Sequence, residues 1–131
     1  MKTIIFLFGA IAILVSCKGN ESVEIGQKTS MFVETVYNAG EVVKGEVITA
    51  RIIVKNTGDY PLVIAAVQPS CSCTVAEKPE DPIAPGEEGE IVTRVDTYNL
   101  TGSNVNKQIS IVANTEPSIT EVFIKAKMKK K

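Results

Sequence analysis

Cys71 and Cys73, separated by one serine, are the residues of this 131-residue sequence with the clearest chemical potential. In an extended strand, residues two apart lie on the same face, about 6.6 Å from each other. That separation is near the upper limit for a disulfide, so a bond would need a bend after Pro69, and its small ring would be strained and labile. Three interpretations stay open: a structural pair (buried thiols or a local disulfide), a thiol-redox pair, or a site for a soft metal ion such as Cu(I).

The redox and metal interpretations each lack part of the usual pattern. Redox pairs are typically Cys-x-x-Cys beside a βαβ unit, and the sequence has neither. Zinc prefers four Cys or His ligands, and histidine is absent. A third ligand for a soft ion would have to come from Met31, Met128 or a second molecule. We therefore favour the structural pair, and expect no metal and no other cofactor.

A third cysteine, Cys17, follows an apolar N-terminal segment and is a candidate for lipidation. Lys2 supplies a positive charge, Ile4–Val15 is apolar apart from one glycine, and Ser16 precedes the cysteine. The segment is shorter than the roughly 20 apolar residues of a membrane-spanning helix, and matches the hydrophobic part of a cleaved signal. We predict a bacterial lipoprotein signal peptide at 1–16 and a lipidated Cys17 that begins a flexible tether over 17–29. Secretion with a free Cys17 is the alternative.

Other reactive side chains do not form a persuasive catalytic set. Without histidine, the commonest general base is missing, and no partner is available to activate Ser70 or Ser72. Acidic residues gather near the cysteines and around a Pro-Gly turn, where carboxylates are usually solvated: Glu77, Glu80, Asp81, Glu87, Glu88 and Glu90. We therefore expect no catalytic residues and no enzyme activity.

Charge is balanced along most of the chain. There are 14 basic and 15 acidic residues, so no basic stripe suited to nucleic acid is present and no nucleic-acid partner is expected. The Lys-rich end, from Lys125 to Lys131, is the local exception. Lysines on an edge strand discourage aggregation, so we interpret this end as a solvated edge strand and tail in preference to a membrane or nucleic-acid patch.

The elements that must position these residues have the period of β-strands. Apolar and polar residues alternate, as in Ile48, Ala50, Ile52 and Val54, and Val, Ile and Thr are frequent. Turn residues separate the runs, at Asn38–Gly40, 56–59, Pro85-Gly86 and 114–117. About seven strands are predicted, near 31–37, 46–55, 61–68, 73–76, 89–96, 106–113 and 119–127. This spacing indicates an all-β sandwich.

Several motifs of this domain occur in a recognisable order: 37–42 (YNAGEV), 52–58 (IIVKNTG), 61–64 (PLVI), 69–74 (PSCSCT) and 83–86 (IAPG). In these motifs the chain resembles the bacterial domain-of-unknown-function family 1573, common in Bacteroidetes lipoproteins, over roughly residues 30–127. One departure is Ser72, where the family usually has glycine. The resemblance implies an immunoglobulin-like β-sandwich over 30–131, similar to domains of ciliary and centrosomal proteins and of pilus chaperones. It implies a cell-envelope location and no established reaction or cofactor. Lys18, in place of aspartate after the lipidated cysteine, favours the outer membrane.

Two functions follow from these observations. The first is a non-catalytic binding or scaffold module, tethered to the membrane through lipid on Cys17 and recruiting an envelope protein. Exposed edges of β-sandwiches commonly recruit partners by strand addition. The second is a metal- or thiol-redox-handling protein that uses Cys71 and Cys73.

Overall fold

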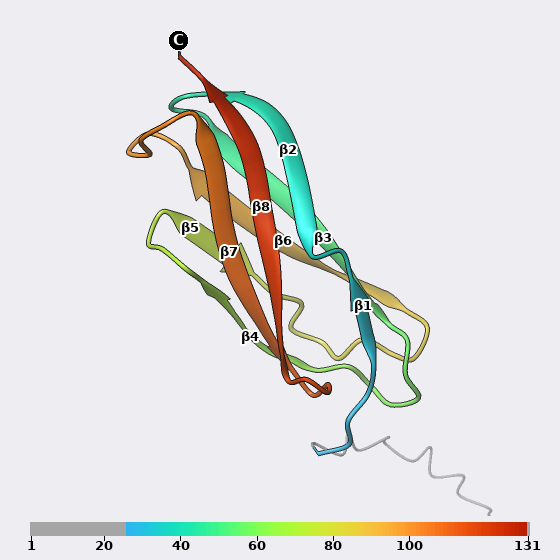
Figure 1. The fold of residues 1–131 in the computed structure, drawn as a ribbon. Helices are drawn as coiled ribbons and strands as arrows, with labels where there is room; N and C mark the ends of the chain where they lie inside the picture. The colour runs from blue at the N-terminus through green and yellow to red at the C-terminus, as the bar shows by residue number, and fades with distance from the viewer. Residues whose placement is uncertain (1–25, 131) are drawn as a thin grey trace, which may run out of the picture.

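Alternating burial organises the chain into eight strands in two layers. The computed structural model describes residues 26–130. One four-stranded sheet has the order β1-β3-β6-β5 and the other the order β2-β8-β7-β4, and both are visible in Figure 1. The strands are β1 (Met31–Val33), β2 (Val36–Val43), β3 (Val47–Asn56), β4 (Ile64–Pro69), β5 (Thr74–Glu77), β6 (Glu88–Asp96), β7 (Asn104–Ala113) and β8 (Ile119–Lys129). The predicted all-β sandwich is confirmed.

The core lies between the two sheets and is built from the period-two positions. In β3, every second residue is buried, from Ile48 to Asn56, and the residues between them are exposed. Strands β6, β7 and β8 contribute further fully buried side chains, among them Ile91, Ile109 and Ile124. Each such aliphatic side chain stabilises the fold by about 1.5–3 kcal/mol. No helix among residues 26–130 has the length and apolar character to cross a bilayer.

About seven strands were predicted and eight are present among residues 26–130, because the run expected as one strand over 31–37 is divided between two strands. The chain leaves the first sheet after Val33 and enters the second at Val36. Strand β1 pairs antiparallel with β3, whereas β2 pairs parallel with β8. The backbone N–H of Phe123 donates to the carbonyl of Thr35 at 2.8 Å, which holds the start of β2 on its new partner. Local alternation carries no information about which sheet a residue joins, so one run became two strands.

The turn expected at Asn38–Gly40 is a β-bulge inside β2. Asn38 is opposite Lys125 and Glu41 is opposite Lys127, so β2 holds one extra residue at this point. Gly40 has a φ of 71°, a left-handed conformation that glycine adopts without steric cost. A bulge and a turn need the same residue types, which explains the error.

The predicted edge location of the Lys-rich end was also wrong. Strand β8 lies between β2 and β7 in its sheet and is hydrogen-bonded to both. Its lysines therefore do not protect an exposed strand edge.

Asn56 anchors the start of the domain and two loops with one buried amide. Its side chain is 0 % exposed. Its Oδ1 accepts hydrogen bonds from the Thr29 hydroxyl at 3.0 Å and the Gly58 N–H at 3.1 Å. Its Nδ2 donates to the carbonyls of Tyr60 at 2.7 Å and Ile83 at 2.8 Å. Thr29, the last residue assigned above to the tether, is itself buried.

Asn56→Ala is expected to destabilise the protein by about 3 kcal/mol, because it leaves the buried polar partners of the Asn56 amide without a hydrogen bond. Urea unfolding followed by circular dichroism measures the change in the free energy of unfolding. The matched control is Asn106→Ala on the exposed face of β7, with an expected change below about 0.5 kcal/mol. Equal stability of the two variants would refute the anchoring role of Asn56.

Candidate functional site

The switch of the chain between sheets leaves part of β3 without a neighbour. On one side β6 pairs with β3 from Val47 to Lys55. On the other side β1 covers only Val54–Asn56. Within residues 26–130, no strand pairs with Val47–Ile53 on that side. This segment is the free β3 edge.

The backbone groups at the free β3 edge alternate in direction. In an antiparallel pair, every second residue exchanges both of its backbone hydrogen bonds with the partner strand. Asn56 donates to and accepts from the β6 side of the sheet, through Glu87 and Gly86. By alternation, the backbone N–H and C=O groups of Thr49, Arg51 and Ile53 point away from β6. They are placed to pair with an added strand.

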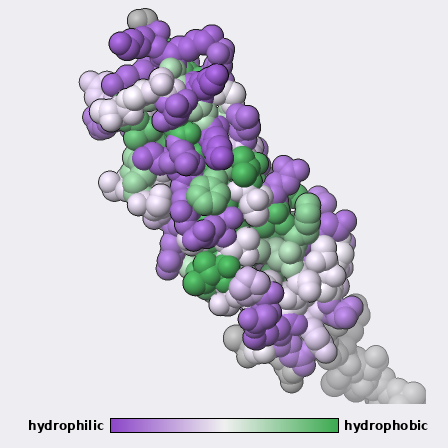
Figure 2. Space-filling model, in the orientation of Figure 1, coloured by the Kyte–Doolittle hydropathy of each residue, from purple (hydrophilic) through white to green (hydrophobic). Residues whose placement is uncertain are grey.

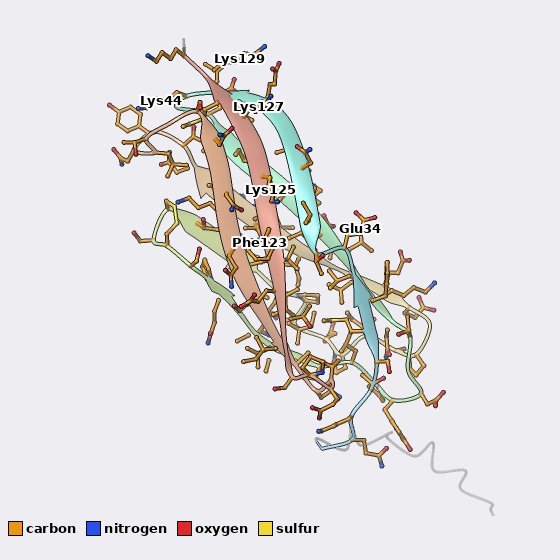
Figure 3. The ribbon with its side chains drawn as sticks, viewed as in Figure 1. Glu34, Lys44, Phe123, Lys125, Lys127 and Lys129 are labelled. Atoms are coloured by element: carbon orange, nitrogen blue, oxygen red, sulfur yellow. A yellow bond between two sulfur atoms is a disulfide. The ribbon has the colours of Figure 1, made fainter. Side chains whose placement is uncertain are left out.

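An open groove of about 600 Å³ runs beside the free β3 edge. Its apolar lining is Phe32, Val36, Tyr37 and Ile53, and its walls include Glu34, at the sheet switch (Figure 3). Phe32 is 60 % exposed and Ile53 is 50 % exposed. The groove therefore offers apolar area beside unpaired backbone groups.

The groove is lined by charged side chains of both signs. Arg51 Nη1 donates to Glu90 Oε1 at 2.7 Å across the β3–β6 pair. The hydrogen bond and the negative charge of Glu90 raise the pKa of Arg51 above its ordinary value. Lys55 and Glu88 are opposite each other in the same pair of strands. The groove thus has both signs of charge and suits a segment of low net charge.

Sequence reasoning missed this groove, although one signal was present. Outward positions of β3 are Val47, Thr49, Arg51, Ile53 and Lys55, and Ile53 is an apolar residue between two charged ones in that series. Phe32 gave no such signal, because its exposure depends on where β1 ends.

Cys71 and Cys73 lie at the corner where the chain passes from β4 to β5. Their sulfurs form a disulfide, with the Cα atoms 5.3 Å apart. Backbone hydrogen bonds fix both ends of the corner: Ser70 N–H donates to the carbonyl of Gln108 on β7, and Asp96 N–H on β6 donates to that of Cys73. The corner therefore joins the two sheets. Cys17, the predicted lipidation site, lies outside the described residues.

The remaining candidate side chains do not converge on the cysteines. Glu77 pairs with Arg94 at 2.5 Å, and Ser70 accepts a hydrogen bond from the backbone of Gln108. Met31 and Met128 pack on the core. The other acidic candidates and Ser72 are solvent-facing or half-buried: Glu80, Asp81, Glu87, Glu88 and Glu90. Among residues 26–130 no group of three or more His, Cys, Asp or Glu side chains is placed to hold a metal ion.

Comparison with known proteins supports the fold. The model of the family described as "Protein of unknown function (DUF1573)" matches residues 30–128. No curated protein matches the sequence. A crystal structure of a protein of unknown function from Porphyromonas gingivalis W83 is similar with a TM-score of 0.69 and 23 % identity, over 81 % of this chain and 50 % of that one. The chain thus spans about half the length of that relative.

Two further solved structures share the architecture. The ASH / PapD-like domain 7 of human CEP192 has a TM-score of 0.57 and 9 % identity, over 95 % of this chain and 99 % of that one. The Vibrio cholerae VesB protease has a TM-score of 0.58 and 11 % identity, over 76 % of this chain and 31 % of that one. At these identities the likeness shows the fold alone. It confirms the immunoglobulin-like sandwich that the sequence motifs implied.

Replacing both cysteines with serine is expected to lower stability only modestly, because the disulfide closes a ring of three residues. Loop-closure entropy for so short a ring amounts to about 1.6 kcal/mol. The measurement is urea unfolding of the Cys71→Ser/Cys73→Ser protein beside the oxidised wild type. Failure of the variant to fold would contradict the modest contribution expected of the disulfide, because backbone hydrogen bonds already fix both ends of the corner.

Proposed function

The chain belongs to the family of proteins of unknown function DUF1573, and from that premise we propose that it is a non-catalytic, membrane-tethered binding module. It recruits an envelope protein by adding one extended segment of that partner to the free β3 edge. Cys71 and Cys73 have no part in the recruitment, since their sulfurs are joined to each other.

The observation that carries this proposal is the pairing of β1 with only three residues of β3. An extended segment placed in line with β1 would meet the backbone groups of Thr49, Arg51 and Ile53. Each backbone hydrogen bond contributes about 1 kcal/mol net, and adding a strand satisfies several at once. The backbone therefore supplies affinity along the edge.

Side chains beside the edge supply selectivity. A strand added to β3 directs alternate side chains to the outer face of the first sheet, where Phe32 and Ile53 are exposed. The preferred segment has apolar residues at those alternate positions and little net charge, because the groove also has Glu34, Arg51 and Lys55 along its walls. Burial of an exposed aromatic side chain is a common source of binding energy at interfaces.

The tether places this module at a membrane. Its support is the sequence: an apolar segment at 4–15, then Ser16 and Cys17, with Lys18 favouring the outer membrane of a bacterial envelope. The segment between Cys17 and the buried Thr29 reaches at most about 40 Å when extended. Two or more acyl chains at its start make a stable anchor. The domain would thus meet only those partners that lie close to the membrane surface.

Ile53→Lys is expected to weaken partner binding roughly tenfold or more, since it places a charge where an apolar side chain of the partner packs. A photo-crosslinking amino acid at Phe32, introduced in cells, labels the bound segment for identification by mass spectrometry. A synthetic peptide of that segment then gives Kd for wild type and variant. Val75→Lys on the exposed face of β5 is the matched control and should leave Kd unchanged.

Backbone pairing is tested with the same peptide. Two methylated versions are made, one N-methylated at the odd-numbered residues and one at the even-numbered residues. Only one of the two loses the backbone N–H groups that face β3. Strand addition predicts loss of binding for one of the two methylated peptides. Equal binding of both peptides, or crosslinks at Val75 in place of Phe32, would rule out the free β3 edge as the site.

Cys17→Ser is expected to release the protein from the membrane fraction, because the thiol that receives the lipid is gone. Fractionation of cell envelopes and intact mass measurement of the wild-type N-terminus test this. A wild-type protein that begins elsewhere than residue 17, or that lacks acyl mass, would contradict the tether.

A further inference from the structure

Three lysines form a row on the outer face of a central strand. Lys125, Lys127 and Lys129 are exposed on β8, while Ala126 and Met128 between them are buried in the core. Figure 3 shows the three lysines following one another along β8 above Phe123. Because β2 and β7 flank β8, protection of a strand edge does not explain the row. It needs another explanation.

Amide side chains stand on both sides of the row. Lys125 is opposite Asn38 of β2 and Asn106 of β7, and Lys127 is opposite Asn104 of β7 and Glu41 of β2. A hollow of about 560 Å³ lies among these side chains, Glu41 included. Hydrophilic side chains crowd this upper end of the molecule in Figure 2. The face combines cations with groups that both donate and accept hydrogen bonds.

The bulge in β2 orients one of these amides. Gly40 N–H donates to Asn38 Oδ1 at 3.0 Å, so the oxygen of that amide is occupied. Within residues 26–130 the Nδ2 group of Asn38 has no acceptor. It is a donor held beside Lys125.

Two of the lysines make no ion pair within residues 26–130. Glu41 is opposite Lys127 in the pairing of β2 with β8, but its carboxylate pairs with Lys129 at 2.5 Å. Within the described part of the chain, no carboxylate lies within salt-bridge distance of Lys125 or Lys127, and Glu121 is two outward positions further along β8 from Lys125. The two ammonium groups are therefore available to anionic ligands.

We propose that this face, formed by Lys125, Lys127, Asn38, Asn104 and Asn106, binds an acidic polysaccharide. Anionic groups of the chain meet the two lysines, which lie about 6.8 Å apart at alternate positions of a strand. Hydroxyl groups of the sugars pair with the amides, which donate and accept. The half-buried ring of Phe123 continues the row and offers an apolar surface to one sugar ring. This site is separate from the free β3 edge and does not depend on the proposed function.

The arrangement fits a polysaccharide better than an anionic membrane. A headgroup layer needs cations and apolar side chains that insert into it, but the one large apolar side chain of this row, Phe123, is half-buried in the sheet surface. Ordered rows of amides are instead suited to a ligand with many hydroxyl groups. Single-stranded nucleic acid would need several stacking aromatic side chains, and Phe123 is the one in this row.

Binding is measured by calorimetry with the purified mature protein and three anionic probes: oligogalacturonate, phosphatidylglycerol vesicles and polyuridylate. Neutral dextran of the same length as the oligogalacturonate is the fourth probe. We expect oligogalacturonate to bind and dextran not to bind. Tighter binding to the vesicles or to polyuridylate, or no binding of oligogalacturonate, would overturn the proposal.

Variants distinguish a specific binding site from non-specific electrostatic attraction. Lys125→Gln/Lys127→Gln is expected to weaken oligogalacturonate binding roughly tenfold or more. Asn106→Ala, which leaves the net charge unchanged, should weaken it roughly threefold through a lost hydrogen bond. Lys28→Gln/Lys78→Gln removes two charges elsewhere and should change Kd by less than about twofold. Equal loss in both lysine pairs, with no effect of Asn106→Ala, would contradict a specific site. Circular dichroism checks that each variant is folded.

Discussion

The structure depends on the point at which the chain leaves the first sheet, after β1, and enters the second sheet as β2. The chain pairs with β3 for three residues, crosses at Glu34 and Thr35, and then pairs with β8. The buried amide of Asn56 holds the entry to this path by its bond to Thr29, and the backbone N–H of Thr57 donates to the carbonyl of Ser30 beside it. The position at which the chain is held before β1, and the position at which it passes to the second sheet, together decide which strand edges are covered.

Two surfaces follow from that one crossing. In the first sheet, the departure of the chain leaves Val47–Ile53 without a partner on the side away from β6, and it opens the groove beside Phe32. In the second sheet, the arrival of β2 covers β8 and turns it into a central strand. The lysines of β8 then lie between two paired strands, and the amides of β2 and β7 are opposite them. A strand-pairing site and a basic face thus have a common structural origin.

The sequence was sufficient for the parts of the fold that depend on local alternation. The buried positions of β3, β7 and β8 and the sandwich itself are predictable from period two and from the turn residues. The sheet crossing was not, because the alternation continues through it and pairing is decided by distant strands. For the same reason Lys125 was placed on an edge strand, and the exposure of Phe32 was not foreseen. The relation of Cys71 to Cys73 stayed open in the sequence because it depends on the bend at the corner.

The most direct measurement of the central claim is amide hydrogen exchange on the free protein, resolved by residue along β3. An uncovered edge predicts alternation: slow exchange at Ile48, Ala50 and Ile52, which are bonded to β6, and fast exchange at Thr49, Arg51 and Ile53, which point away from it. Lys55, opposite Phe32 in β1, should be slow again. Uniform protection from Thr49 to Ile53 would show that the edge is already covered and would contradict the account.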